Sequence, residues 1–495
     1  MAGTYDKTFI STEAKPAQRK RLVVCCDGTW QSATSTDIKH ACQSNVARIS
    51  RVLAKAGVDR NGAAWQQVVY YDAGVGTGAL TKANILLQGA EGFGLLENVL
   101  EAYNFIVCNY TAGDELFFFG FSRGAYTVRA AAGIVQQIGI IQPWLMPQFL
   151  RLFGAYIKAQ ELFEKPQLLD QTDGWRQFCK DYPDCLVSSR EKTVIQVIGV
   201  WDTVGALGVP DIDLGFLKVD NSRLRKAYQF YNTHLGPGVK HAYQALALDE
   251  LRVPFSPCLW QVENGNKQTS LVQCWFPGAH INVGGGNSVN ADEKHPNAEQ
   301  MASIAYAWML DRVRPWLALD EKALDAQKTE MEKLMTHSAP ISELDDWFWG
   351  VIDKSYTAEY RLTGPPTPRT PTAYFDHNNG WTVERVHPTV WLRKKHEESL
   401  LKTYSPAAMS GWERIWVDDG HGKDMKPRKG WKWVKFQKNG SIDASGKPQW
   451  EKSMWEFEVG HMPGSVEQWL IKKSGLVSNE HDEIELGWRS QGPRL

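Results

Sequence analysis

The sequence predicts a mixed α/β fold in which a mostly parallel sheet is covered by helices on both faces. Apolar, β-rich runs recur through the first 280 residues, each ending at a Gly or Asp loop, at 21–26, 67–71, 115–119, 194–201 and 270–276. Helical patterns separate several of them, at 45–54, 94–107 and 125–137. Strands that alternate with helices pair in parallel, and such sheets hold their sites at the carboxyl ends of the strands.

Composition narrows the class of protein and of partner. The 495 residues include 55 basic and 56 acidic side chains, so no overall charge attracts nucleic acid or an anionic membrane. Hydrophobic residues make up 43% of the chain, as in globular proteins, but no run approaches the roughly 18 to 20 apolar residues that span a bilayer. We therefore expect no nucleic-acid partner and no transmembrane segment, and we leave open a peripheral contact with a membrane.

The cysteines and the two chain ends bear on location and cofactors. The eight cysteines lack paired C-x-x-C spacing, which favours reduced, buried thiols over disulfides or zinc. Residues 1–20 are polar without the apolar core of a secretion signal, so we expect a flexible leader and a cytoplasmic protein. The terminal Gly492-Pro493-Arg494-Leu495 weakly resembles a Ser-Lys-Leu peroxisomal address, but Pro493 departs from it. We expect neither a metal nor an organic cofactor.

After the leader, the pattern predicts a catalytic α/β domain at 21–320, closed by a helix at 298–319, and an extension at 321–495. An amphipathic helical insertion at 142–190 is typical either of a lid over an apolar substrate or of a packed helix pair. The extension contains a proline cluster at 365–371 and twelve of the 21 tryptophans. Six of these tryptophans predict either platforms for sugar rings or the core of a small unit: Trp412, Trp416, Trp431, Trp433, Trp450 and Trp455.

A Gly-x-Ser-x-Gly motif at 120–124 follows the third apolar run and precedes a helical run. In that context Ser122 is a candidate nucleophile on a strained strand-to-helix turn, where Gly120 and Gly124 let the two backbones pass closely. The alternative is an ordinary N-cap serine of a packed helix. A nucleophilic serine needs a base and an acid that orients the base, so those partners decide between the two.

Both partners follow later strands, in the order that an α/β-hydrolase requires. Asp202 comes directly after the run at 194–201, and His280 follows the run at 270–276 and precedes three consecutive glycines. A turn-capping role is the alternative for Asp202. His241 lies in an apolar stretch that we interpret as helical, and we keep it as a reserve base or a wall of the pocket.

The loop after the first strand predicts an oxyanion site. Backbone amides near Gly28 and Thr29, together with the amide of Arg123, are placed to donate to an oxyanion, and Asp27 is placed to brace the turn. Haloacid-dehalogenase phosphatases carry Asp-x-Asp-Gly-Thr in such a loop, but Cys25 stands here where their nucleophilic aspartate would be. A Gly-x-Gly-x-x-Ala pattern at 74–79 is an alternative dinucleotide loop, although it follows the second strand rather than the first.

Taken together, these motifs resemble an uncharacterised α/β-hydrolase family of fungi that is related to the type VI secretion phospholipase effectors. The resemblance covers about residues 20 to 315. It implies that Ser122 is the nucleophile, Asp202 the orienting acid and His280 the base, in hydrolysis of lipid-like carboxylic esters through an acyl-enzyme. The family often carries an aspartate two residues after the histidine, where this chain has Asn282.

We therefore expect a serine esterase or lipase whose substrate is a small-molecule or lipid-like ester. The alternative is a catalytically silent protein of the same fold, in which the pocket and the tryptophan-rich extension bind a ligand or partner.

Overall fold

The computed structural model describes most of the chain in segments. These are residues 19–28, 43–74, 93–160, 168–204, 212–213, 218–219, 235–236, 238–262, 266–286, 300–336, 350, 352–357, 364–374, 381–399, 404–421, 427–437, 449–459 and 464–473. Residues 1–18 of the predicted leader, Thr29, most of the 74–79 loop and the terminal tetrapeptide lie outside the described residues, while Arg19 and Lys20 belong to the first strand.

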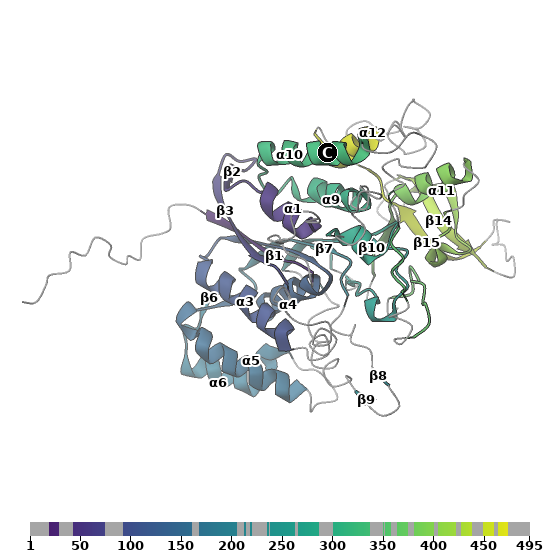
Figure 1. Cartoon of the computed structure of the whole chain (residues 1–495). Coiled ribbons are helices and arrows are strands. Elements are labelled where there is room, and N and C mark those ends of the chain that lie inside the picture. Colours follow the sequence, from purple (N-terminus) through teal and green to yellow (C-terminus); the bar gives the residue numbers. More distant parts are fainter. Residues whose placement is uncertain are drawn as a thin grey trace, which may run out of the picture.

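A large twisted sheet runs through the molecule (Figure 1). Among the described residues it has eleven strands, in the order β13-β14-β15-β12-β11-β10-β7-β4-β1-β3-β2. Their bounds are β1 Arg19–Cys26, β2 Ala56–Val58, β3 Ala64–Asp72, β4 Glu115–Phe121, β7 Val194–Trp201, β10 Val239–Ala247, β11 Ser270–Phe276, β12 Glu384–Val386, β13 Glu413–His421, β14 Pro427–Phe436 and β15 Trp450–Glu456. In this sheet order, neighbouring strands from β15 to β3 pair in parallel. The pairs β13–β14, β14–β15 and β2–β3, at the two ends of the sheet, are antiparallel.

Helices cover both faces of this sheet (Figure 1). On one face lie α3 (Phe93–Asn109), α4 (Ser122–Ile138), α5 (Met146–Gln160) and α6 (Asp173–Asp181), and on the other α1 (Asn45–Val52), α9 (Gln300–Val313), α10 (Glu321–Thr336) and α12 (Val466–Lys473). Residues along β1 alternate between the two cores, with Leu22 and Val24 on the first and Val23 and Cys25 on the second. The predicted mixed α/β fold with a mostly parallel, helix-covered sheet is confirmed.

The predicted strands agree closely with the observed ones, but the prediction of a helix around His241 was wrong. We expected it to be helical, but residues 239–247 form the central strand β10. Because β10 is covered on both faces, Ala242 through Ala247 are nearly all buried, which removes the two-residue alternation that marks a strand.

The helical insertion is anchored to the sheet domain. Its helices α5 and α6 are framed by a short antiparallel pair, β5 (Ile140–Ile141) with β6 (Leu186–Ser188). Phe149, Phe153 and Tyr156 of α5 are buried in the same core as α3 and α4. These contacts are those of the packed helix pair. Residues 161–167, between the two helices, lie outside the described residues, and the lid interpretation stays a prediction.

The extension continues the sheet rather than forming a separate layer. Strand β12 pairs with β11 and β15 pairs with β12, so the sheet runs on past residue 320. A third core joins both parts, because Trp275 of β11 packs with Val386, Trp412 and Trp433. Helix α11 (Thr389–Ser399) lies over this region (Figure 1).

The six tryptophans of the extension differ in burial, and their role as platforms for sugar rings stays a prediction. Trp412 and Trp433 are buried in the third core, whereas Trp416 is 46% and Trp450 37% exposed. Trp416 meets Trp431 edge to face, and the Lys432 ammonium lies over both Trp450 and Trp455.

Three shorter elements lie among the remaining described residues. They are α8 (His280–Gly284), the 3₁₀ turn at Val253–Phe255 and the short antiparallel pair β8 (Ile212–Asp213) with β9 (Lys218–Val219). Within the described part of the chain, no helix combines the length and apolar character needed to cross a bilayer.

Candidate active site

Ser122 lies where β4 turns into α4, and its backbone is strained. Its φ is 56°, a left-handed value that is uncommon outside glycine. The turn is tight, because a Cβ on Gly120 would approach the Ala125 Cα to 2.6 Å and a Cβ on Gly124 would approach the Cys26 carbonyl oxygen to 2.2 Å. Phe121, not Ser122, occupies the N-cap position of α4. Ser122 is therefore not the N-cap serine of the alternative interpretation.

The hydroxyl of Ser122 meets the imidazole of His280. Ser122 Oγ lies 2.9 Å from His280 Nε2, and His280 Nδ1 lies 2.6 Å from Asp202 Oδ2. All three side chains are buried, with 7%, 4% and 0% of Ser122, His280 and Asp202 exposed. The structure thus brings together three residues separated by 158 and 78 positions in the chain, in a serine, histidine, aspartate series.

Parallel pairing explains why they meet. Phe121 is level with Trp201 in the β4–β7 register, and Ala247 is level with Phe276 in the β10–β11 register, so the carboxyl ends of these strands lie at one edge. Asp202 also has a left-handed φ of 40°, directly after β7, and its Oδ1 accepts a hydrogen bond from the Ala247 amide at 3.0 Å.

The pKa shifts at this site favour an ionised Asp202 and a neutral His280. Burial acts to raise the pKa of the Asp202 carboxyl, but Arg369 and His280 outweigh it and hold that pKa below its usual range. Burial lowers the pKa of the His280 imidazole, and the opposing effect of Asp202 does not reverse this. A neutral imidazole beside a hydroxyl can accept its proton, which is what a general base requires.

Two aromatic rings enclose the imidazole. The Phe121 ring centroid lies 4.7 Å from that of His280, and the Phe255 ring meets His280 edge-on at 4.9 Å. The His280 amide donates to Glu250 Oε2 at 3.2 Å, and the same carboxylate pairs with the Arg252 guanidinium. The Arg252 guanidinium in turn lies 3.5 Å from the centroid of the Phe255 ring. His280 is therefore held through its backbone amide and by aromatic contacts on two sides of its ring.

The loop after β1 lies against Ser122. A Cβ on Gly28 would meet the Phe121 ring at 2.8 Å and the Ser122 Cβ at 3.4 Å. The Gly28 amide, however, donates to Asp27 Oδ1 at 2.8 Å, so this expected oxyanion donor is engaged within its own turn. Asp27 also accepts hydrogen bonds from the Ser44 hydroxyl at 2.5 Å and from the Tyr71 hydroxyl at 2.7 Å, and these tie the loop to two other parts of the chain. Arg123 follows Ser122 in the first turn of α4.

Asn282 joins the turn of His280 to the extension, and His241 lies farther back along β10. Asn282 Oδ1 accepts from the amides of Ala279 and Asp353, each at 3.0 Å, and its Nδ2 donates to Asp353 Oδ2 at 3.0 Å. It therefore fastens the His280 turn to the extension, and the acid on the imidazole is Asp202. His241 stacks on Trp316, with centroids 4.6 Å apart, and precedes Ala247 by six residues of β10, about 20 Å of strand. As a reserve base it is too distant.

Sequence reasoning missed Arg369, which contacts Asp202 from the extension. Its two terminal nitrogens lie 2.5 Å from Asp202 Oδ1 and 2.9 Å from Oδ2. A proline-rich segment gives no signal for such a contact. Within the described residues, no group of three or more His, Cys, Asp or Glu side chains is arranged to hold a metal ion.

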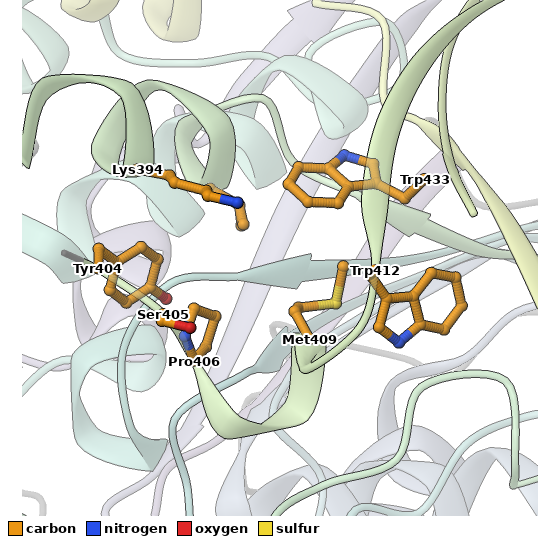
Figure 2. Close-up of a pocket in the computed structure, with 8 residues that line it drawn as sticks. Lys394, Tyr404, Ser405, Pro406, Met409, Trp412 and Trp433 are labelled. Atoms are coloured by element: carbon orange, nitrogen blue, oxygen red, sulfur yellow. The ribbon is translucent and has the colours of Figure 1, made fainter. Parts of the chain in front are cut away.

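A hollow in the extension is joined to the turn before His280 by hydrogen bonds. Figure 2 shows Tyr404, Met409, Trp412, Trp433 and Lys394 around this hollow. The Tyr404 hydroxyl donates to Asp249 Oδ2 at 2.8 Å, and the same oxygen accepts from the Gly278 amide at 2.6 Å.

Comparison with known proteins identifies the family. The model of the family described as "T6SS, Phospholipase effector Tle1-like, catalytic domain" matches residues 20–312, which include Ser122, Asp202 and His280. The chain belongs to this family. The predicted resemblance is thereby confirmed, and Arg369 lies beyond the matched residues.

Individual relatives are distant. The chain is 24% identical over 290 residues to "Uncharacterized protein YEL023C" of Saccharomyces cerevisiae, covering 55% of this chain and 37% of the yeast protein. The structure of the Tle1 effector bound to the VgrG spike from the type 6 secretion system is 17% identical, with a TM-score of 0.28, and the match covers 57% of this chain and 55% of that one. An uncharacterised protein from Pseudomonas aeruginosa is 15% identical, with a TM-score of 0.30, over 71% of this chain and 56% of that one. The chain thus spans little more than a third of the yeast relative and just over half of each solved chain.

Proposed function

We propose that the chain is a serine hydrolase that cleaves carboxylic esters of lipid-like substrates, on an α/β-hydrolase fold. The observation that carries this is the pair of hydrogen bonds from Ser122 to His280 and from His280 to Asp202, at 2.9 and 2.6 Å. Membership of a phospholipase effector family supports the lipid-like acyl substrate.

The proposed reaction has two halves. His280 Nε2 takes the proton of Ser122 as Oγ attacks the ester carbonyl carbon, and the carbonyl oxygen becomes an oxyanion. The imidazolium then gives that proton to the leaving alcohol, which leaves an acyl-enzyme on Ser122. Water, deprotonated by His280, attacks the acyl carbon, releases the carboxylic acid and restores the serine.

Each neighbour has a task in this scheme. Asp202 keeps the proton of the neutral ring on Nδ1, so that Nε2 faces the serine, and it stabilises the imidazolium. Arg123 follows the nucleophile, and we assign its amide to the oxyanion, because donors at the start of a helix favour negative charge. A second donor from Thr29 stays a prediction of the sequence, because Thr29 lies outside the described residues and the Gly28 amide already donates to Asp27. The strained turn at Ser122 is the nucleophile elbow of the scheme.

Labelling of Ser122 tests the proposal. A fluorophosphonate should label the wild type, and Ser122→Ala should abolish labelling. Ser50→Ala is the matched control, since the Ser50 hydroxyl donates to the Ala47 carbonyl within α1. Labelling that persists in Ser122→Ala would remove the assignment.

A panel of p-nitrophenyl esters of increasing chain length, run on wild type and His280→Ala, tests the chemistry. Hydrolysis should be lost in the variant, and its dependence on chain length should define the acyl group. No hydrolysis by the wild type with any ester would instead favour a binding protein.

A further inference from the structure

Arg369 comes from the extension, and its guanidinium is as deeply buried as the site it touches. It lies 57 positions past the end of the family match at 312, and it is 3% exposed. Its segment holds prolines at 365, 366, 368 and 371. Prolines restrict an extended backbone, so little freedom is lost when this segment is fixed. The Thr367 amide, which donates to the Leu251 carbonyl at 2.8 Å, fastens the segment beside the site.

The guanidinium binds both oxygens of the Asp202 carboxylate. Oδ1 accepts from Arg369 at 2.5 Å and from the Ala247 amide at 3.0 Å, while Oδ2 accepts from Arg369 at 2.9 Å and faces His280 Nδ1 at 2.6 Å. A bidentate pair of this kind fixes the plane of a carboxylate, which a single charge cannot do. The direction in which Asp202 presents Oδ2 to the imidazole therefore depends on Arg369.

The same guanidinium joins two walls of the site. It donates to the Ala247 carbonyl at the end of β10 and to the Phe255 carbonyl, each at 2.8 Å. The Phe255 ring is the one that meets His280 edge-on. Arg369 thus holds the acid and one side of the ring pocket in a fixed relation.

Charges around the imidazole balance only when Arg369 is included. Among the described residues, the charged groups that act on His280 or Asp202 include Arg369, Arg252 and Glu250. Two buried carboxylates, Asp202 and Glu250, meet two guanidinium groups, and the neutral imidazole lies between them. Tyr374 is a further titratable group beside Arg369.

We propose that Arg369 is a positioning residue that fixes the Asp202 carboxylate and sets the proton affinity of the Asp202–His280 pair. The extension beyond the matched domain is then part of the working site. This inference rests on the proposed function, since it assigns a role in the same hydrolysis.

The sign of the pH effect follows from charge. Without the Arg369 cation, the Asp202 anion is uncompensated, and a proton is held more tightly whether it lies on the carboxylate or on the imidazole. Hydrolysis needs an ionised Asp202 and a neutral His280, so the acidic limb of the pH profile should move to higher pH. An opposite charge at this range typically shifts a pKa by about 1 to 3 units.

The experiment measures kcat and kcat/KM for a p-nitrophenyl ester against pH in full-length variants. Arg369→Met should move the acidic limb of kcat/KM upward by about one pH unit and lower kcat by about 10- to 100-fold, the cost of a misplaced catalytic group. Arg369→Lys keeps the charge but not the fork, so its limb should stay in place while kcat still falls.

Arg414→Met is the matched control. Arg414 forms a buried bidentate pair with Glu456 within the extension, at 2.7 and 2.6 Å. The Arg414→Met variant therefore loses an interaction equivalent to that of Arg369, but at a different carboxylate from Asp202. It should lower the thermal unfolding temperature and leave the kcat and the limb of the folded enzyme unchanged.

Wild-type kcat and an unmoved limb in Arg369→Met would overturn the proposal, as would an equal limb shift in Arg414→Met. If Arg369→Met does not fold, wild-type kcat in Arg369→Lys overturns it. A wild type that neither hydrolyses esters nor reacts at Ser122 is a different result, because it refutes the proposed function itself.

Discussion

Replacing Gly124 by alanine should separate close backbone packing at the Ser122 turn from ordinary helix propensity. Gly124 is the third residue of α4, and a Cβ there would lie 2.2 Å from the Cys26 carbonyl oxygen and 2.3 Å from that of Asp27. Both obstacles are backbone atoms, which cannot rotate away. To reach van der Waals contact, the first turn of α4 has to withdraw from the end of β1 by about 1 Å.

Two magnitudes follow from that displacement. Overpacking of this kind costs about 1–3 kcal/mol of unfolding free energy. Because the same turn carries Ser122 and faces the Gly28 loop, a shift of about 1 Å should lower kcat by about 100-fold. Stability and catalysis are thus expected to fall together.

Gly154→Ala provides the matched comparison. Gly154 lies in α5, and apart from the backbone of its own helix no atom of the described residues lies within 4 Å of a Cβ built there. Both substitutions gain the same helix propensity, about 0.5–1 kcal/mol, so the difference between them isolates the clash. Urea unfolding should place Gly124→Ala below Gly154→Ala by about 1–3 kcal/mol, with wild-type kcat in the latter. A Gly124→Ala protein that matches Gly154→Ala in stability and retains kcat would refute the close packing at this turn.

Two further predictions concern the site. Because burial lowers the pKa of His280, kcat/KM should fall to half of its maximum only at a pH below 6.5, the usual pKa of histidine. The contribution of His280 to stability should be present above pH 6.5 and lost as the pH falls through the lowered pKa. A midpoint of kcat/KM above pH 7 in the wild type would contradict this. Asn282→Asp would place a second carboxylate where Nδ2 now lies 3.0 Å from Asp353, so it should destabilise the protein by about 1–3 kcal/mol, the cost of an unmade buried hydrogen bond, without raising kcat. Asp353→Asn is the control, because it changes the other partner of the same hydrogen bond. A higher kcat in Asn282→Asp alone would show that the aspartate found at this position in relatives contributes to activity.

The central part of the fold could be read from the sequence because buried parallel strands are distinctive. Runs such as 194–201 and 270–276 are mostly apolar and end at loops, and the structure forms strands over those same residues. Placement of Ser122, Asp202 and His280 at one edge follows once those strands are parallel. Predicting that these three residues lie close together therefore required only the strand topology.

Other features depend on tertiary contacts that leave little local trace. Residues around His241 combine alanine and leucine, which favour helix, yet pairing on both sides and burial on both faces make them strand β10. Strand β12 has three residues, too few for a pattern. Arg369 reaches Asp202 across 167 positions, and in the sequence it is one arginine among prolines.

The parallel pairing of β11 with β12 has a consequence for any shortened form of the protein. Residues 384–386 of β12 cover the hydrogen-bonding edge of β11, where Cys274 and Trp275 are fully buried. A chain cut at the family boundary near 312 would leave that row of amides and carbonyls bare beside large aromatic surfaces, which is a template for association with other chains. Such a fragment should therefore be recovered as aggregate rather than as an inactive monomer.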